Sequence, residues 1–511
     1  MRRLLIGLAS VSAALGVLGA QPAAAGKAND TFIWATDRET PITDSGYHNT
    51  RELVIMGSLL NDRLFFFDET YKPIPLIATA YKWVNDTTLD LDIRKGVKFH
   101  SGEELTAEDV AYTLNFIIDP ASGNFTRSYL SWIKKAEVLD PYKVRLNLDK
   151  PFPTALTFLA GAGNIVRKGH YDNAPARADG KKDFGAVPAN GTGPYKLGEM
   201  KRGESIMLLR NEAYWEGSPK GKGKISKLFY RTIKDSNTRL AELMTGGIDW
   251  AWDIPKDEAE RLQRAPNLNV VNAGTMRIAY LTFDAKGRSA DKRFMDKRVR
   301  EAFNHAINRQ ALVDNLVGKP SVTINAACHP DQFGCAKDLP VYDYNPEKAK
   351  KLLAEAGFPD GFEFDFHAYR ERHYAEAMIG DLAKVGLKAR LVLLQYAPLV
   401  QAIHKGQVSV AFLTWGSSSL PDVSASTGHF FAGSPDDLAQ DPEVISTIKE
   451  ANGTIEPEKR AEVWRKALAR IQEEAYWVPL FTYAKYYAYS KDLNFTPSSD
   501  ELPRFFETTW K

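Results

Sequence analysis

Residues 345–393 read NPEKAKKLLAEAGFPDGFEFDFHAYRERHYAEAMIGDLAKVGLKARLVL, and their apolar spacing switches repeatedly between two periods. An Asn-Pro cap and helical spacing predict a helix over 345–357. Phenylalanines alternate with acidic residues over 362–366, which is strand spacing. The same two patterns then recur, as a helix ending at Gly386 and a strand over 387–393. Helix and strand therefore alternate along this part of the chain.

The alternation continues with a helical segment over 399–405 and a compact apolar run of strand length over 408–413. Parallel neighbours in a sheet need crossover connections, so this order predicts an α/β fold with a parallel sheet covered by helices. Ligands of such sheets bind beyond the carboxyl ends of the strands. The residues that follow these strands are therefore the first candidates for a binding site.

The strand over 408–413 leads directly into an aromatic and hydroxyl-rich turn. We expect ligand contacts there from Trp415, Ser417, Ser418, Ser419 and Asp422. The indole can stack on an apolar or sugar ring, the hydroxyls can exchange hydrogen bonds, and the carboxylate can balance an amine. The alternative is a buried tryptophan followed by a polar loop.

Two further regions supply candidate contacts. Arg370 and Arg372 follow the strand over 362–366, where a planar guanidinium can bind a carboxylate or phosphate; solvated caps are the alternative. Tyr47 lies in Thr43-Asp-Ser-Gly-Tyr-His48. Trp252 alternates with Trp250, and we expect one of the two to face the core and the other to face outward.

The arginines at 298, 300 and 309 are expected on the solvated side of a helix.

The first 25 residues have the pattern of an export signal, with Arg2-Arg3, an apolar run and a small-residue cleavage site at Ala23-Ala-Ala25. Neither cysteine lies near that site, so we expect a free periplasmic protein and not a lipoprotein. Removing the signal takes the formal charge from +2 to zero, and nothing in this balance favours nucleic acid as a partner.

Cys328 and Cys335 are the only cysteines, and in an oxidising compartment they are expected to form a disulfide. A metal site that uses His329 is the alternative, but it lacks a fourth ligand nearby, so we predict neither a metal nor a cofactor. The chain has no Gly-x-Ser-x-Gly elbow, His-Glu-x-x-His or Walker loop, so catalysis is not expected. A secreted hydrolase with unrecognised carboxylates is the rival hypothesis.

Several motifs occur in an order that resembles one known family. They are Gly96-Val-Lys-Phe-His100, Leu105-Thr-Ala-Glu-Asp-Val110, Gly191-Thr-Gly-Pro-Tyr195, Arg210-Asn-Glu-Ala-Tyr-Trp215, Asp296-Lys-Arg-Val-Arg-Glu-Ala-Phe303 and Ala349-Lys-Lys-Leu-Leu-Ala-Glu-Ala-Gly357. Together they resemble the extracellular solute-binding proteins of family 5, the oligopeptide, dipeptide and nickel group of ABC importers.

The resemblance implies a two-lobed periplasmic binding protein of type II, the venus-flytrap fold, with an additional inserted small domain. After the signal peptide (1–25), lobe I is expected to comprise 26–75, 190–283 and 480–511. The inserted domain is expected over 76–189 and lobe II over 284–479, with the chain crossing between the lobes near 280–284 and 478–481.

The resemblance also implies a monomeric receptor that captures a peptide or peptide-like solute and delivers it to an inner-membrane ABC permease. An opine, a sugar conjugate or a nickel chelate are the alternative ligands. In peptide-binding relatives a Trp is followed closely by an aspartate that holds the ligand's amino group. Trp415 matches this pattern, but Ser418 stands at the aspartate position, so either Asp422 takes that role or the ligand lacks the amine.

Overall fold

A computed structural model of the protein describes residues 26–48, 50–416 and 419–511. The predicted export signal over residues 1–25 lies outside the described residues, as do Ser417 and Ser418. None of the helices in the described ranges combines the length and the apolar character that crossing a bilayer requires.

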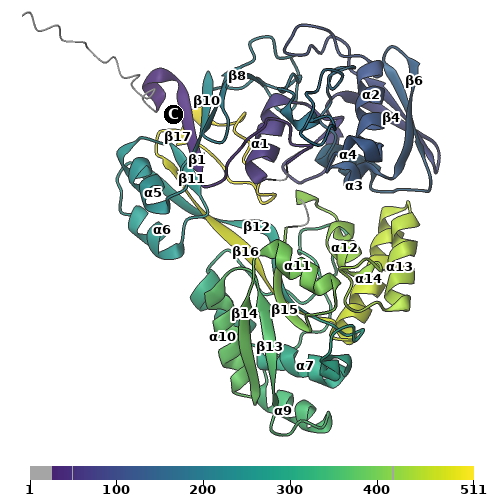
Figure 1. The fold of residues 1–511 in the computed structure, drawn as a ribbon, viewed down its shortest axis with the longest axis vertical. Helices are drawn as coiled ribbons and strands as arrows, with labels where there is room; N and C mark the ends of the chain where they lie inside the picture. Colours follow the sequence, from purple (N-terminus) through teal and green to yellow (C-terminus); the bar gives the residue numbers. More distant parts are fainter. Residues whose placement is uncertain (1–25, 49, 417–418) are drawn as a thin grey trace, which may run out of the picture.

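One sheet of ten strands extends through two lobes, in the order β14-β13-β15-β12-β16-β11-β1-β10-β9-β8. The upper half of Figure 1 contains lobe I, whose part of the sheet packs against α1 (Arg51–Leu60), α5 (Ser236–Thr245) and α6 (Lys256–Leu262). Its strands are β1 (Thr31–Thr36), β8 (Tyr195–Lys201), β9 (Ser205–Arg210), β10 (Lys227–Thr232) and β11 (Trp250–Trp252).

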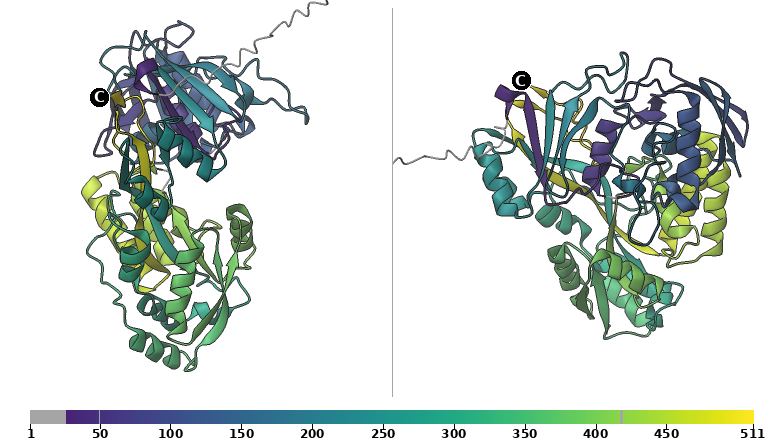
Figure 2. Two further views of the ribbon diagram at one scale, coloured as in Figure 1. Left: turned by 90° about the vertical axis from the view of Figure 1, so that its left-hand side faces the viewer. Right: turned by 45° about the horizontal axis from the view of Figure 1, so that its top comes forward.

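Two long strands connect the lobes. β12 (Leu268–Phe283) and β16 (Trp477–Ser490) pair antiparallel, and they pass from one lobe into the other (Figures 1 and 2). In lobe I β16 borders β11, whereas in lobe II β12 borders β15. The pairing of β12 with β16 is irregular between Gly274 and Ile278, at the passage between the lobes.

The helices and strands predicted over 345–415 are confirmed, and they lie in lobe II. They are α9 (Pro346–Glu355), β13 (Phe362–Ala368), α10 (Arg372–Ala383), β14 (Leu387–Leu393), α11 (Tyr396–His404) and β15 (Val410–Trp415). The side chain of Asn345 caps α9 by accepting a hydrogen bond from the Lys348 amide. β13 pairs parallel with both β14 and β15, as the crossover argument requires.

The remaining helices of lobe II surround this half of the sheet. They are α7 (Lys297–Ala306), α8 (Arg309–Leu312), α12 (Thr427–Phe431), α13 (Pro442–Gly453) and α14 (Pro457–Glu473). The prediction that the arginines of this region are solvated is wrong for Arg300 and Arg309. Both are buried, and their guanidinium groups donate to backbone carbonyl oxygens, among them those of Glu474 and Pro479.

A small domain with its own core lies beside lobe I. Its antiparallel sheet has the order β4-β5-β7-β6 and is covered by α2, which begins with a capping box formed by Thr106 and Asp109. The elements are β4 (Ala78–Asn85), β5 (Thr88–Ile93), α2 (Ala107–Ile118), α3 (Arg127–Leu130), β6 (Ile133–Asp140), β7 (Lys143–Leu148) and α4 (Ala155–Gly161).

Short strand pairs complete the chain. They are β2 (Phe65–Phe67) with β3 (Pro73–Pro75), and β17 (Leu493–Asn494) with β18 (Thr509–Trp510). The C-terminal segment that contains β17 and β18 returns to lobe I, where Phe505 packs against Trp34 and Trp250.

The prediction that Trp250 and Trp252 face opposite ways is wrong. Both side chains are buried in the same cluster of lobe I, and Ala251 faces the other side of the sheet. The physical reason is that residues two apart on a strand share a face.

Candidate functional site

A cavity of about 910 Å³ lies between the lobes. Lobe I contributes the loop that precedes α1, the beginning of α1 and Trp252, and the small domain contributes residues from α2, α3 and the end of α4. Lobe II contributes Tyr369, Arg370, Glu371, Gln395, Tyr396 and Trp415, and the connecting strands contribute Arg277 and Lys485. Its size and its composition from both lobes are typical of a site for a small molecule or a short peptide.

Glu501 holds together the end of the cavity nearest the connecting strands. Its carboxylate is 2% exposed and lies 3.1 Å from Arg51 Nη2, 2.9 Å from Arg277 Nη2 and 3.1 Å from Lys485 Nζ. Burial alone would raise the pKa of Glu501, but the three cations outweigh it and hold that pKa well below its ordinary value. Glu501 is therefore ionised, and it fixes three basic side chains at the cavity wall.

The ion pairs at this end of the cavity contain one more cation than carboxylate. Lys485 also pairs with Asp253 at 2.8 Å, and Arg370 pairs with Glu371 at 2.9 Å. Four basic side chains therefore face three carboxylates: Arg51, Arg277, Arg370 and Lys485 against Asp253, Glu371 and Glu501. The surplus favours an anionic group of a ligand at this end.

The lobe I wall has the opposite character. Asp44 and Glu52 line the cavity, and within the described ranges neither carboxylate forms an ion pair with a basic side chain. Asp44 accepts hydrogen bonds from the Tyr171 hydroxyl (2.6 Å) and the Gly46 amide (2.8 Å). Burial raises the pKa of both carboxyl groups above the ordinary range.

Trp415 lies at the carboxyl end of β15 and lines the cavity, where the sheet topology predicted it. One face of its indole stacks on His429, with ring centroids 4.6 Å apart and planes inclined by 10°. Its Nε1–H donates to the Ala425 carbonyl oxygen (2.7 Å). The ring orientation is therefore fixed by lobe II.

The residues of the turn after Trp415 do not all lie where the predicted ligand contacts require. Ser417 and Ser418 are not described. Ser419 does not line the cavity: its hydroxyl accepts from Arg51 Nη1 (2.6 Å) and donates to the Asp500 carbonyl oxygen, which ties lobe II to lobe I. Leu420 packs into the core of the small domain, against Gly161.

Asp422 is also a correction to the expected site. Its carboxylate is buried, forms two hydrogen bonds of 2.8 Å with the Arg460 guanidinium and caps the backbone at Ser424. It does not line the cavity. Because its charge is matched inside lobe II, Asp422 is not available to a ligand amine.

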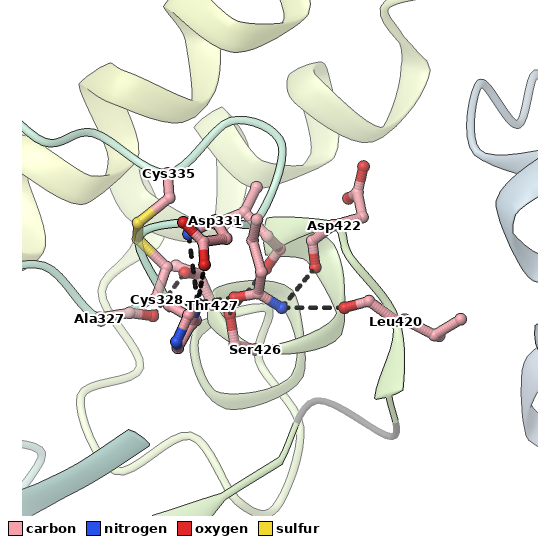
Figure 3. The surroundings of a disulfide bond; sticks show 11 residues. Ala327, Cys328, Asp331, Cys335, Leu420, Asp422, Ser426 and Thr427 are labelled. Carbon is pink, nitrogen blue, oxygen red and sulfur yellow. Dashed lines mark hydrogen bonds and ion pairs between the residues drawn. A yellow bond between two sulfur atoms is a disulfide. The ribbon is translucent and has the colours of Figure 1, made fainter. Parts of the chain in front are cut away.

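The disulfide is adjacent to this turn. The sulfur atoms of Cys328 and Cys335 lie 2.05 Å apart, the distance of a disulfide bond. Figure 3 shows that the loop they close packs against Leu420 and Asp422. Within that loop, Gln332 Nε2 donates to the carbonyl oxygens of both residues (3.1 Å each). The disulfide loop therefore supports the turn that follows Trp415.

The other predicted residues divide into two groups. Arg370 and Trp252 line the cavity, and Lys485 Nζ lies 4.8 Å from the centre of the Trp252 ring. Arg372 faces solvent and pairs with Glu376, so it lies outside the cavity. Tyr47 lies behind the wall, where its ring contacts Tyr171, and burial with the Asp44 charge raises the pKa of its hydroxyl.

Sequence reasoning missed Asp44, Arg51, Arg277, Lys485 and Glu501. Asp44 lies inside the Thr43–His48 segment that the sequence singled out, so only its side chain was overlooked. The other four have no local signal, because the site forms only when distant segments meet. In the described part of the chain, no group of three or more His, Cys, Asp or Glu side chains is arranged to hold a metal ion.

Comparison with known proteins gives a consistent result. Residues 72–437 match the family model described as bacterial extracellular solute-binding proteins, family 5. The chain is 28% identical over 500 residues to the glutathione-binding protein GsiB of Salmonella paratyphi A, with 94% of each chain covered. It is 26% identical to heme-binding protein A of Haemophilus influenzae, with 90% of this chain and 88% of that protein covered.

A solved structure supports the same fold. The ABC transporter substrate-binding protein CtaP of Listeria monocytogenes superimposes with a TM-score of 0.83 at 20% identity, covering 96% of this chain and 100% of that chain. The two-lobed α/β architecture expected from the sequence is thereby confirmed.

Proposed function

Given that this chain belongs to family 5 of the bacterial extracellular solute-binding proteins, we propose that it captures a peptide or peptide-like solute between its lobes for an ABC importer. The cavity of about 910 Å³, walled by both lobes and the small domain, carries this proposal. A ligand there contacts both lobes at once, so it stabilises the closed arrangement over the open one.

The charge distribution supports a peptide-like ligand with at least one carboxylate. Arg370 and Arg277 lie on the wall with the cation surplus, and each presents a planar guanidinium suited to a carboxylate. Trp415 and Trp252 supply apolar surface for side chains of the ligand. Glutathione, which the relative GsiB is named for, combines a peptide backbone with two carboxylates and is the first probe to test.

Closure is proposed to bend β12 and β16 where their pairing is irregular, between Gly274 and Ile278. This point lies N-terminal to the crossing expected near 280–284, because residues 278–283 already pair with β15 in lobe II. We otherwise propose the division into lobe I, inserted small domain and lobe II that the family resemblance implies, with the crossing moved to 274–278 on β12 and to 482–484 on β16.

The cellular setting follows from the family and the N-terminus. We propose that the signal over residues 1–25 is removed on export and that the receptor works as a monomer in the periplasm. There it delivers the ligand to an inner-membrane permease. Binding without bond making is proposed; the rival hydrolase hypothesis predicts that a peptide ligand is recovered in cleaved form.

Native mass spectrometry and titration calorimetry test this function directly. We expect glutathione or short peptides to bind, to quench or shift tryptophan fluorescence, and to be recovered intact. Trp415→Ala is expected to weaken binding about tenfold or more, because it removes a ring fixed at the cavity wall. Trp83→Ala in the small domain, outside the cavity, is the matched control. Binding of none of these probes, or their hydrolysis, would contradict the proposal.

A further inference from the structure

Asp44 is a carboxylate whose charge the protein leaves unmatched. It lies in the loop between β1 and α1, on the lobe I wall of the cavity. Across the described ranges no basic side chain approaches it within ion-pair distance. A carboxylate removed from water without a cation is costly, and that cost is offset when a cation arrives with a ligand.

The surrounding residues hold this carboxylate in place. The Tyr171 hydroxyl donates to Oδ2, and the Tyr171 ring is fixed by stacking on Phe116 with centroids 4.3 Å apart. The Gly46 amide donates to Oδ1. A Cβ at Gly46 would clash with the end of the Asn124 side chain, so a larger residue there would have to displace that side chain. Asp44 is therefore positioned by both lobe I and the small domain.

The carboxylate retains hydrogen-bonding capacity. An ionised carboxylate offers about four lone-pair sites, and the contacts of Asp44 use one on each oxygen. An ammonium group brings three N–H donors and no acceptor, which suits the unused sites. The hydroxyl of Ser45 accepts from Asn164 Nδ2 at 3.0 Å and keeps its own proton to donate to a neighbouring ligand carbonyl.

We propose that Asp44 binds the ammonium group of the ligand and that this receptor therefore takes zwitterionic peptides. This inference rests on the proposed peptide-binding function. The ammonium lies against lobe I, and the carboxylate lies at the end where Arg277 and Arg370 are in surplus. The assignment also accounts for the turn after Trp415, because Asp422 is committed to Arg460 and an amine site in lobe II is not required.

Titration calorimetry with blocked and unblocked probes tests the assignment. The probes are glutathione and trialanine, each with a free and with an acetylated amino group. We expect acetylation to weaken binding to the wild-type protein by at least about 30-fold, since it removes the charge that Asp44 matches. Asp44→Asn is expected to weaken binding of the free-amino probes by a similar factor and to leave the acetylated probes unchanged.

The matched control is Asp86→Asn. Asp86 is an exposed carboxylate of the small domain that does not line the cavity, so no effect on affinity is expected. Circular dichroism and the melting temperature of each variant exclude a folding defect. If the wild-type protein binds the free-amino probes and Asp44→Asn binds them equally well, the inference is wrong while the peptide-binding function stands. If the wild-type protein binds none of the probes, both fail.

Discussion

Glu501 and Asp44 are both carboxylates of the interlobe site, yet their surroundings are opposite. Glu501 is enclosed by Arg51, Arg277 and Lys485, and its pKa is held far below the ordinary range. Asp44 has hydrogen-bond donors but forms no ion pair with a basic side chain in the described part of the chain, and burial raises its pKa. The difference separates two roles: Glu501 neutralises basic side chains of the cavity wall, whereas Asp44 is the carboxylate that we propose for the ammonium group of a ligand.

The comparison extends to two carboxylates outside the cavity. Asp422 resembles Glu501, because Arg460 matches its charge in lobe II. Asp249 resembles Asp44, because it accepts a hydrogen bond from the Ile33 amide but has no cation in the described ranges. Substitutions that remove the charge while keeping the shape should therefore destabilise the first pair and stabilise the second.

The largest effect is expected for Glu501→Gln. Removing one partner of a buried ion-pair cluster leaves cations without a counter-charge, which costs about 3–5 kcal/mol. Urea denaturation should show this loss in the free energy of unfolding. The wild-type contribution should persist on acidification, because a depressed pKa keeps Glu501 ionised until the pH falls through that lowered value.

Glu371→Gln is the control for that substitution. Among the described residues Glu371 forms an ion pair only with Arg370, and it is about a quarter exposed, so the expected loss is below about 1 kcal/mol. Equal effects of the two substitutions would show that Glu501 has no special structural role.

A somewhat smaller effect is expected for Asp422→Asn, about 3 kcal/mol, because it leaves the Arg460 guanidinium buried with its charge unmatched. Ligand affinity should be unchanged. Asp338→Asn, which breaks an exposed pair with Arg465, should leave the free energy of unfolding nearly unchanged. If the Asp422→Asn variant folds but loses ligand affinity, Asp422 would be a ligand contact after all, as predicted from the sequence.

The fold was predictable from the sequence wherever buried residues recur at the spacing of a helix or a strand within one short segment. The helix and strand patterns over 345–415 arise because each element buries one face, and neighbouring residues alone record which face that is. The same logic explains why the place of Trp415 on the cavity wall was predictable: a strand of a parallel sheet carries its last residues to the edge where ligands bind.

The charged part of the site was not predictable, because its partners are distant along the chain. Arg51 and Glu501 are 450 residues apart and meet only when the C-terminal segment returns to lobe I. Asp422 was chosen for its type and position, but its role was decided by Arg460 on α14, 38 residues away. A sequence indicates which residues carry charge, whereas the fold decides which of those charges are already matched.

An effect of the opposite sign is expected for Asp249→Asn. Burial and the nearby Asp492 charge raise the pKa of Asp249 to about 7, above its unfolded value near 4. The native state therefore binds a proton that the unfolded state has released, and wild-type stability falls as the pH rises from about 4 to about 7. The asparagine variant lacks this loss and should be more stable by up to about 4 kcal/mol at pH 8 and unchanged near pH 4.

Thermal unfolding across this pH range measures the difference. Asp179→Asn, at an exposed position, should follow the wild-type curve throughout. A constant difference between Asp249→Asn and the wild-type protein at all pH values would mean that the titration of Asp249 is not its cause.

The smallest change in the free energy of unfolding is expected for Asp44→Asn without ligand. This substitution also tests the comparison between Asp44 and Glu501 most directly. Because burial raises the pKa of Asp44 and no cation offsets the charge, removing that charge should stabilise the ligand-free protein by up to about 1 kcal/mol at pH 8. The gain should shrink as the pH falls, since the native wild-type carboxyl then takes up a proton. With a saturating zwitterionic peptide the order should reverse, because only the wild-type protein gains an ammonium partner. Thermal unfolding with and without trialanine checks this reversal. If the variant is more stable than the wild-type protein in both conditions, Asp44 does not bind the ligand.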